Sequence, residues 1–102
     1  MREKHIEDQF KKAVKDIGGE AYKFESPGNN GMPDRLVVLP GGIIHFVELK
    51  KPKGGILSKL QKFQHRKLKS LGVHVYVIKN EEEIQNFITT CKLEMKLSKG
   101  GG

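Results

Sequence analysis

A chain of 102 residues is long enough for one hydrophobic core, so we expect a single domain. Its 19 Lys and Arg residues against 12 Asp and Glu give a net charge of +7. This excess favours nucleic acid or an anionic membrane surface as partner, unless the lysines serve solubility alone. The single cysteine, Cys91, excludes a disulfide framework, and no apolar run is long enough to span a bilayer. Because the N-terminus lacks a signal-peptide pattern, we expect the protein to work inside a cell.

Helical and strand patterns follow one another along the chain, separated by Pro and Gly turns. We expect, in chain order, a helix over residues 3–17, strands over 21–24, 36–39 and 43–50, a helix over 59–71, a strand over 73–78, and a helix from Asn80 through Cys91. Residues 98–102 are expected to form a disordered tail, so that the domain spans residues 1–97.

The order α-β-β-β-α-β-α predicts the α/β fold class. Three consecutive strands favour an antiparallel meander, and a helix before the fourth strand favours a crossover that makes the last pair parallel. We therefore expect a mixed β-sheet flanked by helices on both faces.

The turn at residues 40–42, Pro-Gly-Gly, determines which residues of the two flanking strands face each other. If these three residues form the loop, Leu39 pairs with Ile43. Asp34 then lies opposite Glu48, and opposed carboxylates with Cβ atoms roughly 4.5–5.5 Å apart repel unless a cation lies between them. A two-residue loop would shift the register by one and separate the two carboxylates.

Strand alternation puts Lys50 on the same face as Glu48. Carboxylate oxygens are hard ligands that suit Mg²⁺ or Mn²⁺ better than zinc. Such a metal can activate water and offset charge on a phosphate, and Lys50 can orient or deprotonate that water. The alternative is an ordinary ion pair at a strand end. The apolar run Ile43–Val47 before Glu48 favours a site.

Two further polar residues have both a functional and a structural interpretation. Glu7 lies on the apolar stripe of the first helix, where it carries a third carboxylate toward the sheet or forms a solvated flank. Gln61 completes a capping box with Ser58 at the start of the second helix, so a catalytic role needs other support. The sequence leaves both alternatives open.

Basic residues gather directly after the expected metal-binding strand. Residues 50–69 include eight Lys or Arg and no Asp or Glu. Because the helix lacks salt-bridge partners there, a phosphate-binding surface is favoured over a merely soluble face. The residues expected to contact DNA are Lys51, Lys53, Lys59, Lys62 and Arg66.

Other chemical patterns are absent from the sequence. No phosphate-cradling P-loop, zinc-finger pattern or nucleophile elbow is present. The four histidines, His5, His45, His65 and His74, show no metal-ligand spacing, and we expect them in surface or strand roles.

The chain contains two short motifs, Pro33-Asp34 followed by Glu48-Leu49-Lys50. In this order, they resemble the motifs of the PD-(D/E)XK nuclease superfamily. More narrowly, the chain resembles the VRR-NUC (virus-type replication-repair nuclease) family over roughly residues 3–90. The segments that carry this resemblance are Glu7, Gly31–Arg35, Phe46–Lys50, Leu57–Gln61 and Leu71–Val77.

The resemblance implies a restriction-endonuclease-like fold and Mg²⁺- or Mn²⁺-dependent hydrolysis of DNA phosphodiester bonds. It implies metal binding by Asp34, Glu48, the Leu49 carbonyl and Glu7. Lys50 would assist the water, and Gln61 would support the site.

Small members of this family further imply a homodimer that prefers branched DNA, such as Holliday junctions. The setting would be phage or bacterial replication and repair, in the cytoplasm of a bacterial or phage-infected cell, with no membrane and no organic cofactor.

Two other functions compete with a structure-selective nuclease. A non-catalytic nucleic-acid-binding module would use the same basic surface, but it has no reason to place Asp34 and Glu48 beside phosphate. A restriction-type nuclease would cut at a specific sequence, but a chain this short has little material for reading bases.

Overall fold

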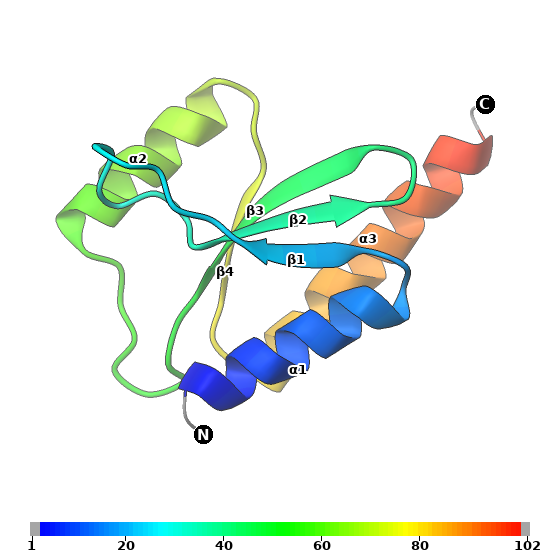
Figure 1. Cartoon of the computed structure of the whole chain (residues 1–102), viewed down its shortest axis with the longest axis horizontal. Helices are drawn as coiled ribbons and strands as arrows, with labels where there is room; N and C mark the ends of the chain where they lie inside the picture. The colour runs from blue at the N-terminus through cyan, green and yellow to red at the C-terminus, as the bar shows by residue number, and fades with distance from the viewer. Residues whose placement is uncertain (1–2, 101–102) are drawn as a thin grey trace.

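The computed structural model describes residues 3–100 of the protein. Its elements follow the expected order α-β-β-β-α-β-α (Figure 1), and the predicted α/β class is confirmed. They are α1 (Glu3–Asp16), β1 (Glu20–Lys23), β2 (Arg35–Leu39), β3 (Ile43–Leu49), α2 (Lys59–Ser70), β4 (Val75–Ile78) and α3 (Glu81–Gly100). Within this range, no helix has the length and apolar character needed to cross a membrane.

The four strands form one mixed sheet in the order β1-β2-β3-β4. β1 and β3 both run antiparallel to β2, and β4 runs parallel to β3, as the meander and crossover predict. Gly41 and Gly42 both have positive φ angles, 93° and 77°, which only glycine adopts easily. They close the predicted three-residue turn, so that Leu39 pairs with Ile43.

Most element boundaries lie within one residue of the prediction, and two differ by more. β4 begins at Val75 rather than at residue 73, because the amide of Val73 donates to the Leu68 carbonyl at the end of α2 (3.1 Å). α3 continues to Gly100, so residues 98–100 of the predicted tail are helical; residues 101–102 lie outside the described residues. Ser98 lies beside the turn after β2, since a Cβ added at Gly41 would lie 3.2 Å from the Ser98 hydroxyl.

The core lies between the sheet and the pair of helices α1 and α3, while α2 covers the opposite face (Figure 1). Phe10 of α1 and Phe87 of α3 meet in this core, with ring centroids 5.5 Å apart. The α2 face is more open, since Ile44 of β3 remains 54% exposed. Residues on β3 alternate between the two faces, and this alternation places Glu48 on the α2 face, away from the apolar core.

Replacing Phe10 with Ala tests the position of this core. Phe10 is fully buried, so we expect Phe10→Ala to lower the free energy of unfolding by about 3–5 kcal/mol, measured by urea denaturation. The matched control is Leu97→Ala on α3, where the side chain is 66% exposed and a change within about 0.5 kcal/mol is expected. Equal losses in the two variants would contradict the assigned core.

Candidate active site

The candidate site lies where β2 begins and β3 ends. Arg35 and Val47 form the last strand pair in this direction, so the confirmed register brings Asp34 and Glu48 to the next opposed positions. The Asp34 side chain reaches across to β3, where its Oδ1 accepts a hydrogen bond from the Leu49 amide (3.0 Å). The backbone of β3 therefore orients the Asp34 carboxylate.

Glu48 is a buried carboxylate, with a relative exposure of 5%. Its Oε2 accepts a hydrogen bond from the side-chain amide of Gln61 (3.2 Å) and lies 3.7 Å from the Lys50 ammonium. Among the described residues, its Oε1 has no hydrogen-bond partner. Burial, followed by the negative charge of Asp34, raises the pKa of Glu48 to about 7, although Lys50 acts in the opposite direction.

These donors fit a hard divalent cation. A buried carboxylate with one unsatisfied oxygen is costly, and a second carboxylate beside it adds repulsion. Lys50 does form the ion pair that an ordinary strand end would show, but this pair leaves Oε1 of Glu48 unsatisfied. A cation held by oxygen ligands would satisfy this atom and would reduce the repulsion from Asp34.

Gln61 serves two groups at the same time. Its side-chain Oε1 accepts a hydrogen bond from the backbone amide of Ser58 (2.9 Å). In return, the Ser58 hydroxyl accepts a hydrogen bond from the backbone amide of Gln61 (3.1 Å). This is the capping box predicted from the sequence. The Nε2 group of the same side chain donates to Glu48. The structural and functional interpretations are therefore compatible, because the oxygen of the Gln61 side chain serves the cap while its nitrogen contacts Glu48.

Glu7 points toward the sheet and forms an ion pair with Arg35, the first residue of β2. Its side chain nevertheless stays 37% exposed, so Glu7 faces both the sheet and solvent. The Arg35 side chain is 5% exposed, and burial lowers its pKa. Metal binding by Glu7 stays a prediction.

Sequence reasoning assigned no role to Arg35. Its position at the start of an apolar strand could have indicated a role, because an arginine buried there needs an acidic partner.

The predicted DNA-contacting residues are exposed along the segment from the end of β3 through α2. They are Lys51, Lys53, Lys59, Lys62 and Arg66. His65, by contrast, is the buried residue of α2. Burial, then the positive charges of Lys69 and Lys50, lower the pKa of His65, which keeps its imidazole neutral near pH 7. α2 thus packs a neutral side chain inward and presents cations outward.

One solved structure is similar to this chain in fold, and one phage protein is similar to it in sequence. A solved structure described as a VRR_NUC domain matches with a TM-score of 0.80 and 30% identity, covering 85% of this chain and 94% of that chain. A phage protein named "Putative nuclease p44", from Acyrthosiphon pisum secondary endosymbiont phage 1, is 46% identical over 82 residues. These residues are 80% of this chain and 87% of that protein. The chain belongs to the VRR-NUC family.

Membership of the VRR-NUC family confirms the resemblance carried by the short sequence motifs and makes this chain a member of a nuclease family. No protein-family model matches the sequence. The assignment therefore rests on the relative and the solved structure, both of which cover most of the chain.

Replacing Glu48 with Gln tests the electrostatic cost of the site. Because the folded protein raises the pKa of Glu48 to about 7, its folded state holds this proton more tightly than the unfolded state, and stability falls as pH rises toward that value. We expect Glu48→Gln to stabilise metal-free protein at pH 8 by on the order of 2 kcal/mol, with little change at pH 4. The measurement is the thermal unfolding midpoint in EDTA.

The matched control is Glu25→Gln, since the Glu25 side chain is 79% exposed and its charge carries little desolvation cost. Adding Mg²⁺ or Mn²⁺ at pH 8 should raise the midpoint of the unmodified protein more than that of Glu48→Gln. A stabilisation that is the same at both pH values would contradict the electrostatic explanation.

Proposed function

We propose that the protein is a Mg²⁺- or Mn²⁺-dependent endonuclease that hydrolyses DNA phosphodiester bonds. The observation that carries this proposal is the unsatisfied, buried Oε1 of Glu48 beside the Asp34 carboxylate, with the Lys50 ammonium 3.7 Å from the other Glu48 oxygen. Family membership supports the reaction class, and these three side chains support the metal and the mechanism.

Asp34, Glu48 and the Leu49 carbonyl would hold the metal. When bound, the metal would lower the pKa of a water molecule and offset negative charge on the phosphate. The Leu49 amide orients Asp34, and the Gln61 amide orients Glu48, so both carboxylates are held in place before substrate arrives.

Lys50 would act on the reacting groups directly. Its side chain is 19% exposed, so the ammonium reaches the edge of the site while staying near Glu48. It would orient the attacking water and stabilise the charge that develops on the phosphate oxygens.

Glu7 would extend the acidic set from α1. Its ion pair with Arg35 holds the Glu7 carboxylate at the start of β2. Arg35 directly follows Asp34 in the chain. From there, Glu7 would help to position the metal or the substrate.

DNA would approach along the basic face. A pocket lined by residues 24–32 and Asp34 opens beside the candidate site. The exposed cations on the loop after β3 and on α2, Lys51, Lys53, Lys59, Lys62 and Arg66, would bind backbone phosphates. Contacts of this kind position DNA without reading its sequence.

Branched DNA, such as a Holliday junction, is the substrate we favour. Residues 3–100 form a single α/β unit, and among them no separate element for reading bases is present. DNA shape would therefore determine selectivity, which suits phage or bacterial replication and repair in the cytoplasm.

A symmetric homodimer would place two sites to cut two strands. Exposed apolar side chains on the α2 side support such an interface, since Ile56, Ile44 and Phe63 are 78%, 54% and 52% exposed.

Replacing Lys50 with Ala tests the chemistry. We expect the unmodified protein to cut a labelled four-way junction with Mg²⁺ or Mn²⁺ and not with EDTA. Lys50→Ala should lower the cleavage rate about 10²–10³-fold, because a donor to the developing charge is lost, while junction binding changes little. Lys11→Ala, an exposed lysine of α1, is the matched control and should cut normally.

Tight junction binding without cleavage under either metal would reject the nuclease proposal and favour the non-catalytic binding module. Equal cleavage of the junction and of linear duplex DNA would keep the chemistry and remove the preference for branches. Cleavage confined to one sequence would favour the restriction-type alternative.

The two functions of Gln61 can be separated by a pair of variants. Ser58→Ala breaks the capping box and keeps the amide contact to Glu48, so it should lower stability by about 0.5–2 kcal/mol and leave the cleavage rate unchanged. Gln61→Glu keeps a residue type that completes the box and replaces the amide donor with a third carboxylate. It should retain stability in the presence of metal and cut at least about tenfold more slowly.

Thermal unfolding and single-turnover cleavage on the same preparations measure both effects. An unchanged rate in Gln61→Glu would limit Gln61 to its capping role.

A further inference from the structure

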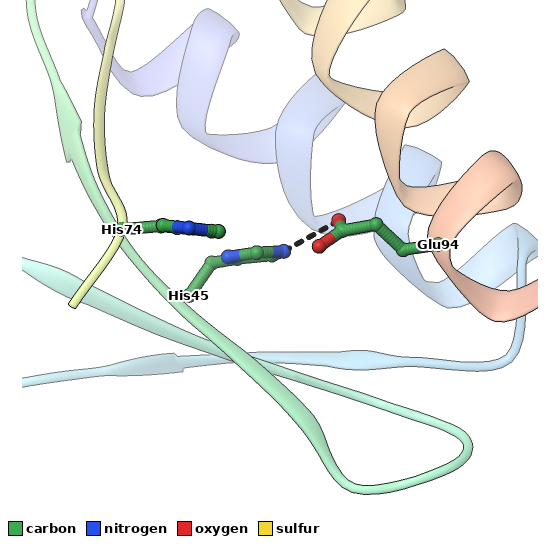
Figure 2. A group of neighbouring side chains, drawn as sticks. All are labelled: His45, His74 and Glu94. Atoms are coloured by element: carbon green, nitrogen blue, oxygen red, sulfur yellow. Dashed lines mark hydrogen bonds and ion pairs between the residues drawn. The ribbon is translucent and has the colours of Figure 1, made fainter. Parts of the chain in front are cut away.

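A second group of metal-ligating side chains lies on the α1/α3 side of the sheet. His45 comes from β3, His74 directly precedes β4, and Glu94 comes from α3 (Figure 2). One ligand atom from each residue lies within 4.8 Å of the other two. β3 alternation separates this group from the nuclease site, because His45 and Glu48 point to opposite faces.

The contacts among the three side chains are direct. His45 Nε2 and Glu94 Oε1 are 2.7 Å apart, and Figure 2 shows these two groups pointing toward one another. The ring of His74 lies beside that of His45, with centroids 5.3 Å apart and planes inclined by 13°. Tyr76 and Phe87 meet the His45 ring edge to face, at centroid distances of 5.4 and 5.8 Å. These aromatic contacts fix the position of His45.

We propose that His45, His74 and Glu94 form a second metal site, for a transition metal ion of the zinc type. Two imidazoles and one carboxylate are a ligand set that zinc prefers and Mg²⁺ does not. The nuclease site offers carboxylate and carbonyl oxygens instead. The two sites are therefore expected to select different metals.

Binding such an ion requires movement of the two ligands that are more exposed than His45. Zinc–ligand bonds of about 2.0–2.1 Å in a tetrahedral site place the ligand atoms roughly 3.4 Å apart, compared with a spread of up to 4.8 Å here. His45 is buried and stays fixed, while His74 is exposed and the Glu94 side chain is 28% exposed. On binding, Glu94 would move slightly away from His45, because their ligand atoms lie 2.7 Å apart, and His74 would turn toward the ion. The fourth position would face solvent.

The charge balance also favours a cation at this place. Among the described residues, the partner of the Glu94 carboxylate is His45, which compensates its charge only when protonated. A divalent ion would neutralise Glu94 while both imidazoles stay uncharged.

A metal at this point would connect β3, the start of β4 and α3. Because the three ligands come together only in the folded chain, binding stabilises the native state. A small domain with one core gains most from such a link.

Thermal unfolding and titration calorimetry with zinc chloride at pH 7.5 test the proposal. The unmodified protein should bind one zinc ion and gain several degrees in its unfolding midpoint. His74→Ala should weaken zinc binding at least tenfold and abolish the gain, and it should still fold because this side chain is exposed. His5→Ala, which removes another exposed histidine, should behave like the unmodified protein.

Glu48→Gln separates this site from the nuclease site. Full zinc binding and stabilisation in that variant would support the second site, whereas their loss would place the ion at Glu48 and overturn the proposal. The proposal is equally overturned if zinc fails to stabilise the unmodified protein, or if His74→Ala keeps the full effect. With Co²⁺ in place of zinc, a visible absorption band that is lost in His74→Ala would assign the imidazole ligand directly.

Discussion

The repulsion between Asp34 and Glu48 is the constraint around which this fold is arranged. β2 and β3 hold the two carboxylates at neighbouring positions, and burial then raises the pKa of Glu48 to about 7. The end of β3 cannot move away without breaking the sheet, because the Lys50 amide donates a hydrogen bond to the Ile78 carbonyl of β4 (2.9 Å). The apolar core on the opposite face supplies the stability that this arrangement requires.

The features that follow from local patterns could be predicted from the sequence. Two glycines after Pro40 produce the three-residue turn, and this turn determines the register that brings Asp34 to Glu48. The capping box at Ser58 is equally local. The contact from Gln61 to Glu48 could not be predicted in this way, because it depends on where the crossover places α2 over the sheet.

Contacts between distant elements escaped the sequence analysis for the same reason. Glu7 and Arg35 are 28 residues apart, and His45 and Glu94 are 49 residues apart. Metal-ligand spacing reports ligands within one helix or loop, so it could not detect ligands on β3, near β4 and on α3. Alternation along β3 places His45 on one face of the sheet and Glu48 on the other. The sheet therefore separates the imidazole ligands from the carboxylates of the nuclease site.

Gly31 explains how the loop before Asp34 and the start of α2 act together. Its φ angle is 91°, and a Cβ at this position would lie 2.9 Å from backbone atoms of Leu60. Only glycine allows this approach. The neighbouring carbonyl of Asn30 also accepts a hydrogen bond from the Gln64 side chain (3.3 Å). Because Gln61 follows Leu60, the contact at Gly31 sets how closely Gln61 reaches Glu48. Within the Gly31–Arg35 motif, the glycine thus allows α2 to approach Glu48, and the aspartate at the start of β2 lies beside the same carboxylate.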